Sequence, residues 1–302
     1  RLFLVFNTPT DIGNGAYYGL LAAPFVHIDV LHIFFNMLLF WELGARIEWT
    51  LGRQFLFIFT SFAALVTSGA QLFTGGWPCI GASGIVFAFF GLMLGARRKV
   101  PLFFSYLTTE RSYMFIGWLF LCLLITWFNL MPIGNVAHFS GFAFGLAVSA
   151  VFFNRSWLLA GVAGLGALAL IAVLSTFWAP FNSHWTYWKY HHALKQQQPA
   201  AAQVLLDKAA NVRNINLLNE IAWRLATSPT DSERNGAKAV EIAKRASEPS
   251  NWKEPAIIDT LAAAYAEVGE WDEALQTQQR ALDVLRMAFE EDLLTSADYA
   301  TV

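Results

Sequence analysis

The chain has 302 residues, and only 14% of them are charged, whereas a soluble domain is usually about one quarter charged. Residues 1–184 hold 13 of the 42 charged side chains, and residues 185–302 hold the other 29. The net charge is −2 and no basic run is interleaved with aromatic residues, which argues against nucleic acid as a partner. We therefore predict a transmembrane domain over residues 1–184 and a soluble helical domain over 185–302.

Long apolar runs in the first domain predict membrane-spanning helices. A span needs about 20 apolar residues, and continuous runs without alternation indicate helices and not barrel strands. The clear candidates are residues 54–73, 80–96, 113–132, 136–153 and 156–178, and a weaker one is 29–45, which contains three polar residues. The predicted fold class is all-α: a polytopic transmembrane helical bundle followed by a soluble helical domain.

Lys and Arg residues in the connections predict the orientation of the bundle. The connections 46–53 and 97–112 and residue Arg155 carry these cations, whereas 74–79 and 133–135 carry none. Basic connections stay in the cytoplasm. We therefore expect a multi-pass membrane protein in the lipid bilayer, with Ser83 and His138 near its outer face.

Four polar residues within the predicted spans are candidates for a functional site, because such groups are costly in a membrane. They are Ser83 in "GASG", His138 in "NVAHFSGFAFG", and His32 and Asn36 in "LHIFFN". His32 and Asn36 are four residues apart, so they share a helix face. Taken singly, each has a structural interpretation, Ser83 as a helix cap and the others as hydrogen bonds between helices.

Two rows of small residues predict close contact between the serine and histidine helices. The rows are His138, Gly141 and Gly145 in one helix, and Gly84, Ala88, Gly91 and Gly95 in the other. Small residues at this spacing let two membrane helices approach closely. We expect Ser83 and His138 to come within hydrogen-bonding distance, so that the imidazole activates the hydroxyl as a base. Backbone N–H groups at the start of the serine helix, His32 and Asn36 are expected donors to an oxyanion.

The remaining polar residues of this region are assigned structural roles. Asp29 is expected to cap the helix that follows it. His27 is five residues from His32 and is expected to point elsewhere. Cys79 and Cys122 are expected to be unpaired, and we expect neither a cofactor nor a metal.

The motifs together resemble those of the rhomboid intramembrane serine proteases. "GASG" at 81–84, "AHFSGFAFG" at 137–145 and "HIDVLHIFFNM" at 27–37 occur in the order of that family. The resemblance implies that Ser83 is the nucleophile, His138 the base, and His32 and Asn36 the oxyanion donors, without an acidic third member. It implies structural roles for Gly81, Gly84, Gly141 and Gly145. It also implies cleavage of transmembrane segments of membrane proteins near their outer end, in a bacterial inner membrane.

The sequence departs from the family pattern in two places. The family usually has one helix before the one with the His and Asn, so an upstream helix is either missing or ends at residues 1–6. The family often has a Trp-Arg pair in the loop before the first histidine of the motif, where this chain has Tyr18-Gly19. The run 156–178 would be an extra helix after the rhomboid core.

The second domain is predicted to be helical, with loops at 228–236 and 248–255. Residues 257–282 resemble a tetratricopeptide repeat, with Leu261, Ala262, Tyr265, Gly269, Ala274 and Ala281 at its packing positions. A looser copy precedes it, and residues 185–215 are expected to supply a capping helix. A repeat of this kind implies a surface that binds a protein or peptide, and the alternative is a plain helical bundle.

Three classes of function are compatible with these features. The first is an intramembrane serine endopeptidase whose tail binds substrate or partner proteins. The second is a catalytically inactive rhomboid-like scaffold that binds membrane proteins. The third is a small transporter, which short connections and the absence of an internal repeat disfavour. Retention of both Ser83 and His138 favours the protease.

Overall fold

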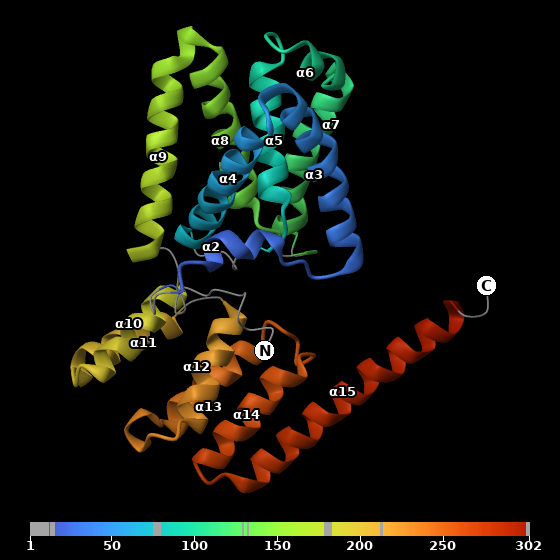
Figure 1. The fold of residues 1–302 in the computed structure, drawn as a ribbon. Helices are drawn as coiled ribbons and strands as arrows, with labels where there is room; N and C mark the ends of the chain where they lie inside the picture. The colour runs from blue at the N-terminus through green and yellow to red at the C-terminus, as the bar shows by residue number, and fades with distance from the viewer. Residues whose placement is uncertain are drawn as a thin grey trace. The chain divides into compact units, whose positions relative to one another are not determined.

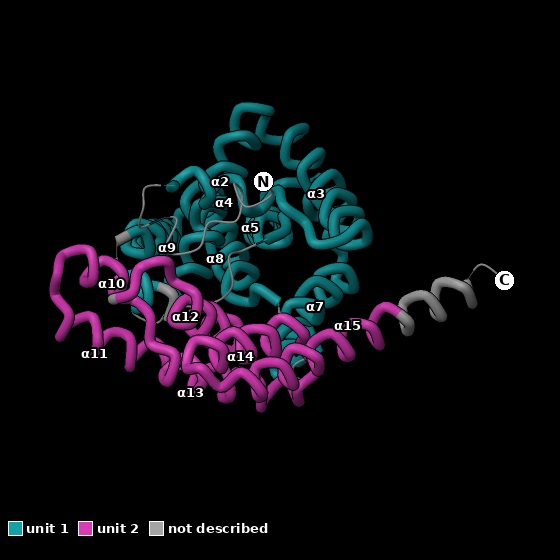
Figure 2. Tube along the Cα trace, turned by 90° about the horizontal axis from the view of Figure 1, so that it is seen from below, with its two compact units in different colours: residues 1–188 teal, residues 189–302 magenta. Residues whose placement is uncertain are grey.

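The computed structural model describes residues 12, 16–74, 80–128, 130–131, 133–177, 183–211 and 214–299. Among these residues every regular element is a helix, as predicted. The chain forms two compact units, residues 1–188 and 189–302 (Figure 2).

The first unit is a bundle of apolar helices (Figure 1). Within the described residues, four helices are long and apolar enough to cross a membrane: α3, α4, α8, and α9 together with the short turn before it. In chain order the elements are α2 (Gly19–Ala22), η2 (Ala23–Phe25), α3 (Val30–Leu51), α4 (Arg53–Phe73), α5 (Ser83–Ala96), α6 (Pro101–Tyr106), α7 (Thr109–Trp127), α8 (Asn135–Phe153), η3 (Arg155–Trp157) and α9 (Leu158–Phe177).

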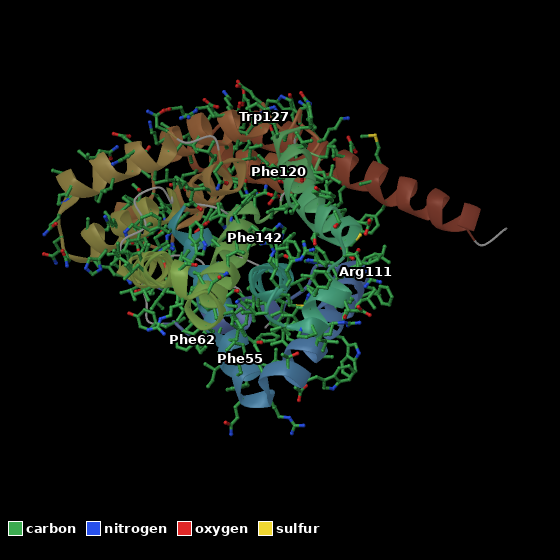
Figure 3. All side chains as sticks on the ribbon, turned by 90° about the horizontal axis from the view of Figure 1, so that it is seen from above. Phe55, Phe62, Arg111, Phe120, Trp127 and Phe142 are labelled. Carbon is green, nitrogen blue, oxygen red and sulfur yellow. The ribbon has the colours of Figure 1, made fainter. Side chains whose placement is uncertain are left out.

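Helix α5 lies at the centre of this bundle and contacts α3, α4 and α8 (Figure 1). Its sequence SGIVFAFFGLMLGA is apolar on every side, as expected of a helix that other helices surround. Phe89 and Phe90 are fully buried, and Phe142 of α8 stacks on Phe90 with ring centroids 5.4 Å apart. Figure 3 labels Phe142 in a view of the side chains from above. The core of the unit is therefore built around the helix that begins with Ser83.

The outer surface of the bundle is apolar, which fits a bilayer and not water. Val30, Trp41, Phe57, Trp127 and Leu159 each expose more than 70% of their surface. Soluble proteins rarely expose such a density of large apolar side chains. The unit is an integral membrane unit.

Three of the predicted spans differ clearly from the structure in their bounds. Helix α3 runs from Val30 to Leu51, whereas the predicted span was 29–45. Helix α7 begins at Thr109 and ends at Trp127, whereas the predicted span was 113–132. The early start follows from Thr108, whose side chain accepts a hydrogen bond from the N–H of Arg111 and caps the helix. Helix α5 has 14 residues, fewer than the predicted 17.

The second unit begins within α10, and from α12 to α15 each helix packs against the next. The loops at 228–236 and 248–255 are confirmed, because helices end at Thr227 and Ser247 and the next ones begin at Gly236 and Pro255. Where one capping helix was predicted, the structure has two. From the start of α10 the elements are α10 (Ser183–Lys195), α11 (Pro199–Ala210), α12 (Ile215–Thr227), η4 (Asp231–Glu233), α13 (Gly236–Ser247), α14 (Pro255–Glu267) and α15 (Trp271–Tyr299).

Helices α14 and α15 pack against each other, and predicted packing positions of the repeat are buried. Leu261 and Ala262 of α14 and Ala274 and Ala281 of α15 are buried, and Gly269 makes the turn with φ +81°. A positive φ favours glycine because it has no Cβ. This packing is compatible with a tetratricopeptide-type pair, which stays a prediction.

Candidate active site

The backbone before α5 makes a tight turn that brings Ser83 to the first position of the helix. Gly81 has φ +92°, a conformation that favours glycine. A Cβ atom at Gly81 would also lie 2.5 Å from Nε2 of His32. Glycine is therefore required here both by the conformation and by the approach of the α3 histidine.

Ser83 and His138 are hydrogen-bonded: Oγ lies 2.7 Å from Nε2. Backbone contact between α5 and α8 makes this possible. A Cβ at Gly141 would lie 2.1 Å from the carbonyl oxygen of Gly84, and one at Gly145 would lie 2.0 Å from that of Ala88. The predicted packing of the two small-residue rows is confirmed.

His138 is held by an aromatic ring and a hydroxyl. It is 5% exposed, and its ring lies 4.9 Å from that of Phe87, centroid to centroid. Its Nδ1 has no hydrogen-bond partner among the described residues. If Nε2 accepts the Ser83 proton, Nδ1 carries the imidazole hydrogen, and no carboxylate of the described chain assists it.

His32 and Asn36 line the opposite side of the Gly81 turn. The predicted cap is confirmed, since the carboxylate of Asp29 accepts a 2.7 Å bond from the N–H of His32. The N–H of Ile28 points to Nδ1 of His32 at 3.4 Å, which leaves the hydrogen on Nε2, the atom that faces Gly81.

The side-chain amide of Asn36 is a second donor beside the same turn, after the imidazole of His32. Its Nδ2 donates to the carbonyl of His32 at 2.8 Å and lies 3.5 Å from the position of a Cβ at Gly81. The first N–H groups of α5 also lack partners within the helix. Donors from α3 and α5 thus lie on either side of the turn that carries Ser83.

His27 is not where we expected it. It lies before α3, not on the helix, and its ring is 5.0 Å from that of His32 in an edge-to-face arrangement. The helical spacing argument failed because Asp29 starts the helix after His27.

Sequence reasoning missed Gln71, a buried residue near the end of α4. Its Oε1 accepts a 3.1 Å hydrogen bond from the N–H of Ala137, the residue before His138. One of the otherwise unpaired N–H groups at the start of α8 is satisfied in this way. The only signal in the sequence was an amide within a predicted span.

The length of α5 sets the depth of Ser83. Fourteen residues span about 21 Å, less than the roughly 30 Å hydrocarbon core. Arg97, Arg98 and Lys99 follow its other end, and cations belong at the interface. The Ser83 end is therefore the one expected to lie below the membrane surface.

These features define a class: a polytopic helical membrane protein in which a half-buried serine is hydrogen-bonded to a buried histidine. Residues 14–155 match the family model of the Rhomboid domain. The match over these residues agrees with the resemblance that the motifs predicted.

Similar proteins support the same assignment. The chain is 37% identical over 127 residues to the rhomboid protease GlpG of Enterobacter sp. (strain 638). The aligned residues make up 41% of this chain and 44% of that protein. It is 34% identical over 130 residues to that of Klebsiella pneumoniae (strain 342), covering 42% and 45%. It is 33% identical over 126 residues to that of Pectobacterium atrosepticum, covering 41% and 44%. The matched region thus spans less than half the length of these relatives.

The cysteines and the possibility of a metal site remain to be described. Cys122 is a free, buried cysteine as predicted, whereas Cys79 lies outside the described residues. No group of His, Cys, Asp or Glu that could hold a metal occurs among the described residues.

Proposed function

We propose that this protein is an intramembrane serine endopeptidase in which Ser83 is the nucleophile and His138 the general base. The observation that carries the proposal is the 2.7 Å contact between Ser83 Oγ and His138 Nε2 within an apolar bundle. A serine hydroxyl is a weak nucleophile until a base takes its proton, and imidazole is the usual base.

The chemistry follows from the positions of the donors and acceptors. Ser83 Oγ attacks the scissile carbonyl carbon while its proton passes to Nε2 of His138. The resulting oxyanion accepts hydrogen bonds from Nε2–H of His32, the amide of Asn36 and N–H groups at the start of α5. His138 then gives the proton to the leaving amine, and a water molecule, activated by His138 in the same way, hydrolyses the acyl-enzyme.

The substrate class in this proposal is membrane proteins with single transmembrane segments, cut near the outer end of the segment. The basic residues gather at the end of the bundle opposite Ser83. Arg46 of α3 and Arg111 of α7 stack on the ring of Tyr106, at 3.8 Å and 4.6 Å. By the distribution of cations this end is cytoplasmic, so the site faces outward. Similarity to the enterobacterial proteases supports placement in a bacterial inner membrane.

The scaffold alternative is less compatible with the geometry. A protein that only holds membrane partners has no need of a buried imidazole bonded to a serine hydroxyl, because burying polar groups in a membrane is costly. The protease proposal gives each of the four polar residues a role.

The test is labelling by a fluorophosphonate together with cleavage of a single-span substrate in proteoliposomes. We expect Ser83→Ala to abolish labelling, and Ser83→Ala and His138→Ala each to lower the rate by about 10⁴–10⁶. His32→Ala and Asn36→Ala should each lower it by about 10–10³. Ser105→Ala is the matched control, because Ser105 lies on α6 and bonds only the carbonyl of Leu102. Cleavage by Ser83→Ala at the wild-type rate would refute the proposal.

The tail is proposed to bind substrate or partner proteins. Trp271 and Leu275 of α15 are 70% and 72% exposed, which is unusual for large apolar residues of a soluble helical unit. Replacing both by alanine should raise KM for a protein substrate and leave kcat unchanged. An unchanged KM for every substrate tested, with no loss of partner binding, would refute this role.

A further inference from the structure

Helix α9 packs backbone to backbone on the outer side of α4. A Cβ at Gly69 of α4 would lie 2.8 Å from Cα of Ala172 and 3.2 Å from Oγ of Ser175. The Ser175 hydroxyl donates to the carbonyl of Ala172 at 2.7 Å, which holds this side chain against its own helix. The side chain of Ala172 is a single methyl group. No larger side chain separates the two helices at this point.

The other side of α4 faces the candidate site. Thr67 and Gln71 are four residues apart and share a face, whereas Gly69 lies roughly opposite, since successive residues turn by about 100°. A Cβ at Gly84 would lie 3.0 Å from Cβ of Thr67, and Gln71 holds the N–H of Ala137. Helix α4 therefore packs against α9 on one side and against α5 and α8 on the other.

The first turn of α9 is fixed to α8, the helix that carries His138. A Cβ at Gly161 would lie 2.8 Å from the carbonyl oxygen of Ala147 and 3.0 Å from Cβ of Ala150. Helix α9 thus runs from a close contact with the far end of α8 to a close contact with α4 two residues before Gln71. Figure 1 shows α9 beside α4 and α8 at the edge of the bundle.

We propose that α9 is a brace that keeps α4 in the position catalysis requires, with Gly69 and Ala172 as positioning residues. The brace holds the Gln71 amide on the first turn of α8, and so holds the imidazole of His138 on Ser83. A displacement of about 1 Å in such a contact can cost about 10²-fold in rate. The inference rests on the proposed protease function.

The test enlarges the side chain at Gly69. Gly69→Leu forces α9 and α4 apart, and we expect kcat to fall at least about tenfold while KM changes less than about twofold. The rate of fluorophosphonate labelling at Ser83 should fall in parallel with kcat. Gly166→Leu is the control, since Gly166 is also a helical membrane glycine but has open space around its Cβ position.

A compensating pair separates positioning from simple loss of fold. Gly69→Ala should lower kcat by about three- to tenfold. Adding Ala172→Gly removes the 3.0 Å contact with the Ala172 methyl group but keeps the 2.8 Å contact with its Cα, so it should restore kcat in part. This pair decides the question if Gly69→Leu does not fold.

The outcomes distinguish this inference from the proposed function. If wild-type protein shows no Ser83-dependent cleavage, the protease proposal itself fails. If wild type cleaves and Gly69→Leu retains kcat within twofold, the brace is refuted and the protease stands. If Gly69→Ala lowers only the melting temperature, or if adding Ala172→Gly does not raise kcat above that of Gly69→Ala, α9 contributes stability alone and the brace is likewise refuted.

Discussion

Replacing Gly141 by alanine should separate Ser83 from His138. The new Cβ would lie 2.1 Å from the carbonyl oxygen of Gly84, the residue after the serine. Carbon–oxygen contacts between helices recur at about 3.3 Å, so the methyl group must retreat by about 1.2 Å. Because the obstacle is backbone, no rotamer change relieves it. Half of that displacement already lengthens the 2.7 Å hydrogen bond beyond about 3.2 Å, where it weakens sharply.

The expected result is a fall in kcat/KM of about 10²-fold, with a loss of about 1–3 kcal/mol in stability from overpacking. The assay is cleavage of a single-span substrate in proteoliposomes, with thermal unfolding measured on the same preparations. Gly117→Ala is the control, because nothing lies within 4 Å of a Cβ at Gly117 on α7. Activity of Gly141→Ala within twofold of wild type would show that the helix contact does not set the serine–histidine distance.

Three further changes test individual contacts. Gln71→Met removes the acceptor for the N–H of Ala137 and should cost about 1–3 kcal/mol in thermal unfolding, with a lower kcat. Asp29→Ala removes the cap of α3 and should cost about 1 kcal/mol, also measured by thermal unfolding. Burial, and then the charge of Arg224, lower the pKa of His191 to about 4, below its ordinary 6.5. The unfolded chain therefore binds the proton more readily, so stability should fall as pH drops from about 6.5 towards 4, and His191→Gln should reduce this loss in denaturant titrations at pH 7 and 5.

The contact between the serine and histidine helices could be predicted because it depends on which residues occupy each helix face. Glycines at spacings of three and four mark a helix face, and a polar residue at the end of each face identifies what the contact brings together. The cap at Asp29 was predictable for a similar reason, since an acidic residue directly before an apolar run has a local partner.

The role of Gln71 could not be predicted in this way. Its partner is the backbone N–H of Ala137, 66 residues away, and a backbone group leaves no trace in the sequence. The contact of Gly69 with Ala172 was equally hidden. Each of these residues is small and unremarkable by itself, and the residue on the other helix is known only once the helices are in place.

His27 shows how a boundary can undo a spacing argument. The prediction assumed one helix through residues 27–36, on which residues five apart point in different directions. Asp29 caps the helix, which begins at Val30, so His27 lies outside it. The ring of His27 contacts the ring of His32 edge to face. Helical periodicity applies only after the cap.

In the proposed mechanism, the packing around His138 does the work of a carboxylate, which no described residue supplies. A carboxylate in a triad fixes the tautomer and orientation of the imidazole and stabilises its charged form. Here Phe87 contacts one side of the ring, and the glycine contacts of α8 fix the backbone that carries it. In this proposal packing supplies the orientation, and Nδ1 has no hydrogen-bond partner within the part of the chain that the structure describes. A buried carboxylate would add a second ionisable group in a membrane, where each is costly.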